Sequence, residues 1–280
     1  MKKNSYHHEL VDAQGTVHLP ATGELRIVSL VPSITELLFA LGLGEHIVGR
    51  TAYCIHPAEK VAAIRPIGGT KVVNMPRISA LNATHLIVNI DENPKEIVEE
   101  LAALIPNIIV THPLTVRDNL ALYRLLGGIF GRQQQAENLC LAFEQAYHAL
   151  QQAAQALPKK QVLYFIWKAP WMGISHETYI ADMLRLVNWE LAFSSENMRY
   201  PVLNLDAEFL EKTDLFLFSS EPYHFKASDL DEFENDFSIV PRARLQLVDG
   251  EMLSWYGSRA IQGMQYLQEV AFEFTAPSIR

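Results

Sequence analysis

The sequence predicts an α/β protein made of two Rossmann-like lobes that are joined by a single long helix. Short apolar runs alternate with helical patterns on both sides of residues 132–157, as is typical of parallel sheets with helical crossovers. The segment 132–157 contains neither Gly nor Pro, and its apolar side chains recur at helical spacing. A chain of 280 residues can form two cores, so we expect lobes at residues 1–130 and 159–280 around a linking helix at 131–158.

The linking helix is expected to end before Pro158. At a rise of about 1.5 Å per residue it would be roughly 40 Å long, which exceeds an ordinary crossover helix. A stiff connection between two lobes leaves a cleft, and clefts between domains are common sites for small ligands.

In the first lobe, three apolar runs predict buried parallel strands, and a helical pattern follows each of them. Ser33 or Thr35 is expected to cap the first helix. That helix should end at Gly42 or Gly44, and Gly127-Gly128 should end the third helix. The predicted strands are Arg26–Val31, His85–Ile90 and Asn107–Thr111, and the predicted helices contain Leu37–Leu41, Asn93–Leu104 and Val116–Leu126.

The second lobe repeats this alternation of strands and helices. One of its helical segments is strongly acidic and is expected to face solvent. The predicted strands are Gln161–Trp167, Asp214–Ser219 and Arg244–Val248, and the predicted helices are Thr178–Leu186, Ala207–Lys212, Ser228–Phe237 and Ser258–Phe272.

Composition and charge disfavour several classes of protein. The formal net charge of −9 argues against a nucleic-acid binder and against adhesion to anionic lipid. No apolar run reaches the ~18 residues that a membrane-spanning helix needs, so we expect no membrane insertion. Residues 1–20 begin with lysines but contain no apolar core, so they do not form a signal peptide as they stand. The chain is therefore either cytoplasmic, or a periplasmic or cell-surface protein whose export signal has been replaced by Met.

The sequence shows no catalytic motif and no metal-binding motif. Cys54 and Cys140 are not part of a CxxC pair, and Cys140 lies on the apolar face of the long helix, where we expect a buried thiol. The ten histidines show no HExxH spacing, and GxSxG, P-loop and GxGxxG motifs are absent. We therefore predict no catalytic residues, no required cofactor and no metal site.

Aromatic side chains gather in the loops that follow predicted strands. Ligands of open α/β sheets bind at the carboxyl ends of strands, and flat aromatic surfaces suit a large planar ligand. The aromatics are explained either by packing between the lobes or by a pocket, and their recurrence in successive loops favours the pocket. Glu221 emerges directly from an apolar strand and is expected to accept hydrogen bonds from a ligand, whereas Asp249-Gly250 is interpreted as a turn. The candidate loop residues are Tyr53, Trp171, Tyr200, Glu221, Tyr223 and Trp255.

A family resemblance supports this interpretation. Arg26–Gly42 (RIVSLVPSITELLFALG) resembles the opening strand and helix of the cobalamin- and iron-siderophore-type substrate-binding proteins of ABC importers, in particular their vitamin B12-binding members. The segments Tyr53–Pro57, Gly69-Thr70 and Ser254-Trp255 extend the resemblance. It implies the fold of class III periplasmic binding proteins, a monomer, and a corrinoid, haem or ferric-chelate ligand that is passed to an ABC permease.

The resemblance also implies roles for individual residues. Aromatic side chains of both lobes cover the corrin ring in the vitamin B12-binding members, and by position these are Tyr53 in the first lobe and Trp171, Tyr200 and Trp255 in the second. Lys71 stands where those members have a tryptophan, which leaves haem, a metal chelate or another corrinoid open. Tyr223 and Arg259 complete the expected ligand-binding set.

Two glutamates match the surface carboxylates that dock these proteins onto permease arginines. They are Glu36, in SITELLFALG, and Glu208, in LDAEFL. An acidic residue in the first turn also stabilises a helix dipole, and for Glu36 both roles are compatible.

Three functions remain open from the sequence. The first is a non-enzymatic protein that binds a cobalamin-like, haem-like or metal-chelate ligand for an ABC importer. The second is a metal chelatase or tetrapyrrole-modifying enzyme, since chelatases also use two α/β lobes. The third is a cytoplasmic ligand-sensing protein, because three segments (WKAPWMGISHETYIADML, SSEPYHF and DGEMLSWYGSR) resemble a subgroup of such proteins without export signals.

Overall fold

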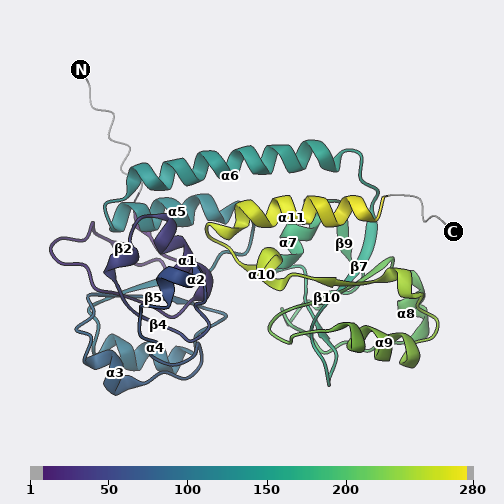
Figure 1. The fold of residues 1–280 in the computed structure, drawn as a ribbon, viewed down its shortest axis with the longest axis horizontal. Coiled ribbons are helices and arrows are strands. Elements are labelled where there is room, and N and C mark those ends of the chain that lie inside the picture. Colours follow the sequence, from purple (N-terminus) through teal and green to yellow (C-terminus); the bar gives the residue numbers. More distant parts are fainter. Residues whose placement is uncertain (1–8, 276–280) are drawn as a thin grey trace. The chain divides into compact units, whose positions relative to one another are not determined.

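The computed structural model describes residues 9–275, apart from the side chain of Ala243, and divides them into two compact units. The first unit consists of the described residues through Pro113 together with Arg117–Leu141, and the second consists of Leu114–Val116 and the residues from Ala142 onward. The division falls within α6 (Gln133–Ala154), which Figure 1 shows as one unbroken helix. The predicted long helix is thus confirmed, and α6 is two residues shorter than the range 131–158 at its start and four residues shorter at its end.

The first unit contains a four-stranded parallel sheet in the order β4-β3-β5-β6. From β3 the chain continues to β4 on one side of the sheet, whereas from β5 it continues to β6 on the opposite side. Because the direction of the connections reverses between β3 and β5, the carboxyl ends of these two strands form a topological switch point. The strands are β3 (Ile27–Ser29), β4 (Ile47–Arg50), β5 (His85–Asn89) and β6 (Asn107–Thr111). The helices are α1 (Pro32–Ala40), α2 (Ala58–Val61), α3 (Met75–Ser79), α4 (Lys95–Ala102) and α5 (Asp118–Ile129).

The second unit is built around β7 (Lys160–Trp167), the longest strand described. Its sheet runs parallel except for one short strand, which turns back against the carboxyl end of β7. The other strands are β8 (Met172–Gly173), β9 (Trp189–Leu191), β10 (Leu215–Ser219) and β11 (Leu245–Val248), of which β8 is antiparallel. The helices are α7 (Tyr179–Arg185), α8 (Ala207–Lys212), α9 (Ala227–Asp236), α10 (Gly250–Ser254) and α11 (Arg259–Glu273). The predicted fold class is confirmed.

Two expectations about helix ends are wrong. Helix α1 begins at Pro32 and its N-cap is Val31, so neither Ser33 nor Thr35 is the cap. Gly127 and Gly128 lie inside α5 instead of ending it. A Cβ at Gly128 would collide with the side chain of Leu10, so this glycine allows the first strand of a hairpin to lie against α5.

Several short elements were not predicted. The hairpin β1 (Leu10–Val11) and β2 (Val17–His18) is closed by Asp12, whose carboxylate accepts from the backbone N–H groups of Gln14 and Thr16. Asp249 is the N-cap of α10 and not part of a free turn, since it accepts from the N–H of Met252. Elements of two to five residues bury too little apolar surface to leave a periodic pattern.

Candidate ligand-binding site

Exposed apolar side chains gather at the carboxyl edge of the first unit's sheet. Tyr53 follows β4 and is 63% exposed, Ile90 directly follows β5, and Val72 lies in the loop between α2 and α3. Large apolar groups of this kind are normally buried, and a group of them at a strand edge marks a surface that contacts a ligand.

The loop at residues 68–73 is held firmly against this edge. The N–H of Gly69 donates to the carbonyl of Val72, and the N–H of Ala52 donates to the carbonyl of Gly68. Gly68 has a φ of +130°, and a Cβ built on it would clash with the backbone of the same loop. The ring of Tyr53 rests against Gly69, where an added Cβ would lie 3.3 Å from Cε2. Lys71 is exposed in this loop.

Asn93 ties three loops together at the switch point. Its Nδ2 donates to the carbonyls of Leu30 (3.3 Å) and Thr70 (2.9 Å), while its Oδ1 accepts from the N–H of Asn89 (2.8 Å). Farther along the same edge, Asp91 and His112 form an ion pair with 3.3 Å between Oδ2 and Nε2 when the imidazole is protonated. The carboxyl edge of this sheet is therefore a polar, connected surface with exposed rings and alkyl groups around it.

In the second unit, the loops after β10 and β11 meet at the carboxylate of Glu221. Its Oε1 accepts from Ser254 Oγ (2.7 Å) and from Trp255 Nε1 (2.8 Å). Burial raises the pKa of the Glu221 carboxyl; these two hydrogen bonds lower it in part, and the charges of Glu251 and Asp249 raise it further. The expected acceptor is thus occupied by groups of its own unit.

Trp255 is buried and held on two sides. Its edge donates to Glu221, and the guanidinium carbon of Arg259 lies 5.0 Å from its ring centroid, a cation–π arrangement. Arg259 is also buried and pairs with Glu251 at 3.3 Å. These contacts fix the orientation of the indole within the second unit.

Trp171 is half-buried and packs against an aromatic cluster in the core of the second unit. Its ring is stacked nearly parallel to Phe225 at 6.0 Å between centroids. The other rings around it, all in edge-to-face geometry, are Phe165, Phe218 and Phe233 at 5.3–6.3 Å. The buried part of the Trp171 ring therefore stabilises the core of the second unit.

The exposed rings of the second unit are different ones. Tyr200 is 40% exposed, and Trp167, which sequence analysis missed, is 42% exposed at the end of β7. Trp167 contacts Tyr223 edge-to-face at 5.7 Å, and the Tyr223 hydroxyl donates to Asp229 at 3.4 Å. The signal for Trp167 lies in the strand itself, because its last residue follows five buried residues and emerges at the carboxyl edge.

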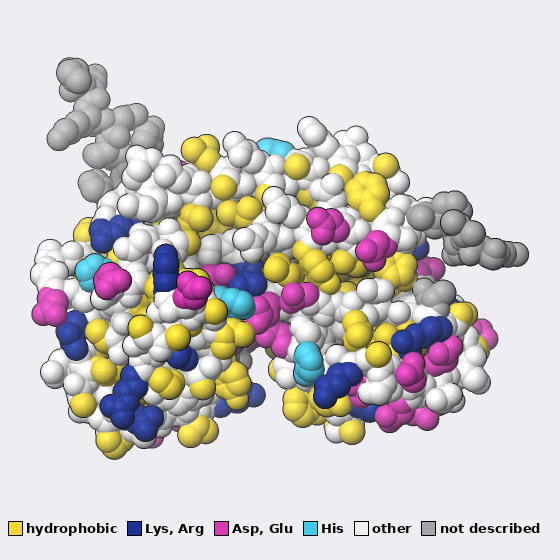
Figure 2. Space-filling model, in the orientation of Figure 1, with side chains coloured by type: hydrophobic (Ala, Val, Ile, Leu, Met, Phe, Trp, Pro, Cys, Tyr) yellow, Lys and Arg dark blue, Asp and Glu magenta, His cyan; other side chains and the backbone are white. Residues whose placement is uncertain are grey.

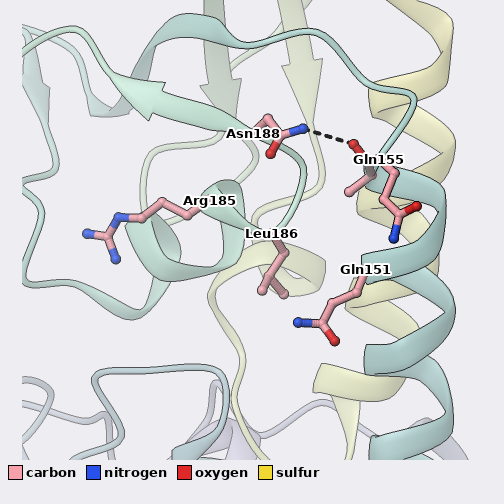
Figure 3. Close-up of a pocket in the computed structure, with 6 residues that line it drawn as sticks. Gln151, Gln155, Arg185, Leu186 and Asn188 are labelled. Atoms are coloured by element: carbon pink, nitrogen blue, oxygen red, sulfur yellow. Dashed lines mark hydrogen bonds between the residues drawn. The ribbon is translucent and has the colours of Figure 1, made fainter.

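Two pockets occur within the second unit. One, of about 410 Å³, opens at the carboxyl ends of β10 and β11 and is lined by Ser220, His224, Phe225, Lys226, Leu247, Val248 and Asp249. The other, of about 490 Å³, lies by the carboxyl end of α6 and is shown in Figure 3. There Asn188 Nδ2 donates to the carbonyls of Ala154 and Leu157, and Arg185 is bonded to Asp182 and to the carbonyl of His176. The Asn188 amide and the Arg185 guanidinium that line this pocket are therefore already bonded to neighbouring groups of the second unit.

The two glutamates expected to dock a permease differ in their surroundings. Glu36 is half-buried on α1 and lies beyond its first turn, so the expected helix-dipole role is wrong. Glu208 is exposed in the first turn of α8 and pairs with Lys212 at 2.6 Å. On the face drawn in Figure 2, acidic and basic side chains of the described residues are interspersed and form no continuous basic stripe.

Two other features are absent from residues 9–275. No three His, Cys, Asp or Glu side chains come together there as a metal-binding group. None of the described helices is both long enough and apolar enough to span a bilayer.

Comparison with known proteins places these features in context. The sequence profile of the periplasmic binding protein family matches residues 27–236. A vitamin B12-binding protein of Photorhabdus laumondii is 25% identical over 196 residues, which cover 70% of each chain. Among solved structures, the periplasmic vitamin B12-binding protein BtuF of Vibrio cholerae superposes with a TM-score of 0.76 at 16% identity, covering 90% of this chain and 98% of its own. The periplasmic heme-binding protein RhuT of Roseiflexus sp. RS-1 superposes with a TM-score of 0.77 at 23% identity, covering 91% of this chain and 100% of its own.

Proposed function

Because the chain belongs to the periplasmic binding protein family, we propose that it binds a cobalamin-like, haem-like or other metal-chelate ligand and delivers it to an ABC importer. The family and the relatives that match are binding proteins and not enzymes, so the chelatase and tetrapyrrole-modifying alternatives are set aside. A relative that binds vitamin B12 and a structural neighbour that binds haem share one chemical class of ligand, a flat tetrapyrrole-type ring around a metal.

One observation supports this ligand class most directly. Each unit exposes aromatic and alkyl side chains at the carboxyl edge of its sheet, beside polar groups that can orient a ligand. A flat ring system with a polar periphery is complementary to such a surface, because the rings cover its apolar faces and the loops bind its substituents.

Within the expected ligand-binding set, we assign direct contact to the exposed rings. Tyr53 and Tyr200 expose 63% and 40% of their surface to solvent, and we propose that their rings stack on the ligand. Trp255 is held in place by Glu221 and Arg259. We propose that these three residues position the loops and contact the ligand only through their exposed atoms. Lys71 and Tyr223 are proposed to contact the polar periphery.

The test is a binding titration with cyanocobalamin, haem and a ferric siderophore. For the ligand that binds, Tyr200→Ala should weaken affinity by about 1–2 kcal/mol, since a stacked ring and its buried area are lost. Phe272→Ala is the matched control, because Phe272 is an aromatic side chain of the same 40% exposure on α11 in the same unit. The absence of binding for all three ligands would overturn the proposal.

Docking to an ABC permease is proposed to use Glu36 and Glu208. In cells that depend on this protein for uptake, Glu208→Arg should abolish uptake while ligand affinity in solution stays unchanged, because a reversed charge repels an arginine on the partner. Glu211→Arg, on the same exposed helix, is the control and should leave uptake intact. Equal loss in both variants would argue against a specific docking role.

A further inference from the structure

A buried serine hydroxyl at the switch point of the first unit has no hydrogen-bond partner. Ser33 is only 3% exposed, and its Oγ has no partner among the described residues. Buried hydroxyl groups are nearly always bonded, because leaving one unpaired costs free energy. An unpaired hydroxyl in this position therefore indicates a group that binds there.

The backbone next to Ser33 offers further donors of the same kind. The first amide of α1 with a helical acceptor is that of Thr35, which donates to Val31 at 2.9 Å. The N–H groups of Ser33 and Ile34 precede it and have no carbonyl within the helix, and the N-cap Val31 has no side chain that could accept from them. Because a helical Cβ tilts toward the N-terminus, the Ser33 hydroxyl lies on the side of these amides.

The location fits a ligand site. Ser33 is the second residue of α1, directly after the β3–α1 connection and at the switch point between β3 and β5. Asn93 ties the carbonyl of Leu30 in this connection to the loop that carries Lys71, so the helix start and a lysine-bearing loop belong to one hydrogen-bonded edge. The positive end of the helix dipole and a lysine both favour a negative charge.

We propose that the N-terminus of α1, with the Ser33 hydroxyl and the N–H groups of Ser33 and Ile34, binds an oxyanion group of the ligand, a carboxylate or a phosphate. The assignment rests on the proposed function for the source of the oxyanion, and the site itself requires only inorganic phosphate to be tested. Lys71, in the neighbouring loop, adds long-range attraction.

The first experiment measures thermal unfolding of the full chain in millimolar phosphate against chloride at equal ionic strength. Phosphate should raise the melting temperature of the wild type, and Ser33→Ala should lose this increase. Without phosphate, Ser33→Ala should melt no lower than the wild type, because it removes a hydroxyl that bonds to nothing. Ser79→Ala, which changes an exposed serine at the carboxyl end of α3 in the same unit, is the control and should keep the phosphate effect.

Three results would overturn the proposal. A wild type that phosphate does not stabilise beyond chloride overturns the proposal. So does a phosphate effect that persists in Ser33→Ala, or one that is lost equally in Ser79→Ala.

The second experiment asks whether the ligand supplies the oxyanion. Cyanocobalamin is compared with cyanocobinamide, which lacks the nucleotide phosphate, and haem is compared with its dimethyl ester, which lacks the propionate charges. Ser33→Ala should weaken binding of the charged member about tenfold and leave the other unchanged, as expected for one charge-assisted hydrogen bond. Equal losses for both members of a pair would remove the ligand as the source. If neither corrinoid nor haem binds the wild type, the proposed function fails, while the phosphate experiment still decides the site.

Discussion

Replacement of Trp171 separates a structural role from a ligand-binding role. The indole has four phenylalanine rings around it at centroid distances of 5.3–6.3 Å, all in the core of the second unit. Trp171→Ala removes these contacts and leaves a cavity, because the surrounding rings belong to β7, β10, α9 and the loop before α9 and cannot all move inward.

The expected loss follows from the extent of burial. Truncation of a fully buried Trp costs about 3–5 kcal/mol, and the half-buried Trp171 should cost about 2–3 kcal/mol in the free energy of unfolding. Trp171→Phe keeps a ring in the stack and should cost about 1 kcal/mol. Trp167→Ala is the control: this exposed Trp at the end of β7 contacts the ring of Tyr223, and its removal should cost only about 0.5–1 kcal/mol.

Urea unfolding followed by far-UV circular dichroism measures these differences without relying on tryptophan fluorescence, which the substitutions themselves change. The midpoint should fall in the order Trp167→Ala, Trp171→Phe, Trp171→Ala, with similar slopes. If Trp171→Ala is no less stable than Trp167→Ala, the aromatic cluster does not hold this ring, and Trp171 is available entirely to a ligand.

Two further predictions concern the second unit. Burial raises the pKa of the Glu221 carboxyl above its ordinary value of 4.5. The protonated carboxyl therefore contributes its full stability to the fold below about pH 4.5, and this contribution is lost as the pH rises through the raised pKa. Glu221→Gln cannot titrate, so its free energy of unfolding relative to the wild type should increase from about pH 4 to about pH 7 in urea titrations; a constant or falling difference contradicts the assignment. Gly263→Ala should destabilise the protein by about 2 kcal/mol or more in the same assay, since its Cβ would collide with the backbone carbonyl of Met252; an unchanged midpoint would show that α10 shifts freely against α11.

The regular part of the fold was predictable because it depends on long apolar runs. Asn107–Thr111 and Ala207–Lys212 form the strand and helix that were expected, residue for residue. The helix expected at Thr178–Leu186 is α7, and Thr178 is its N-cap, accepting from the N–H of Ala181. These features are local, so sequence periodicity and cap chemistry are sufficient to find them.

Features that depend on tertiary contact were not predictable. Gly127-Gly128 has the composition of a helix terminator, but the side chains of Leu10 and Ala136 lie where Cβ atoms would be, and close packing keeps both glycines inside α5. Strand β8 exists because the chain reverses after Pro170 and pairs with β7, a contact that two residues cannot signal. Ser33 was expected as a cap, and only the start of α1 at Pro32 reveals an unpaired hydroxyl instead.

The roles of the aromatic residues in the candidate site also depend on tertiary contacts. Sequence identifies aromatic residues in loops after strands, but it cannot distinguish a ring that packs inward from one that faces outward. Trp255 is buried against Glu221 and Arg259, whereas Tyr53 and Tyr200 are exposed to solvent. We therefore expect affinity for a flat ligand to depend on the exposed tyrosines directly. Substitution of Trp255 should act through the loop, so it should lower stability and affinity together, while Tyr53→Ala and Tyr200→Ala should lower affinity alone.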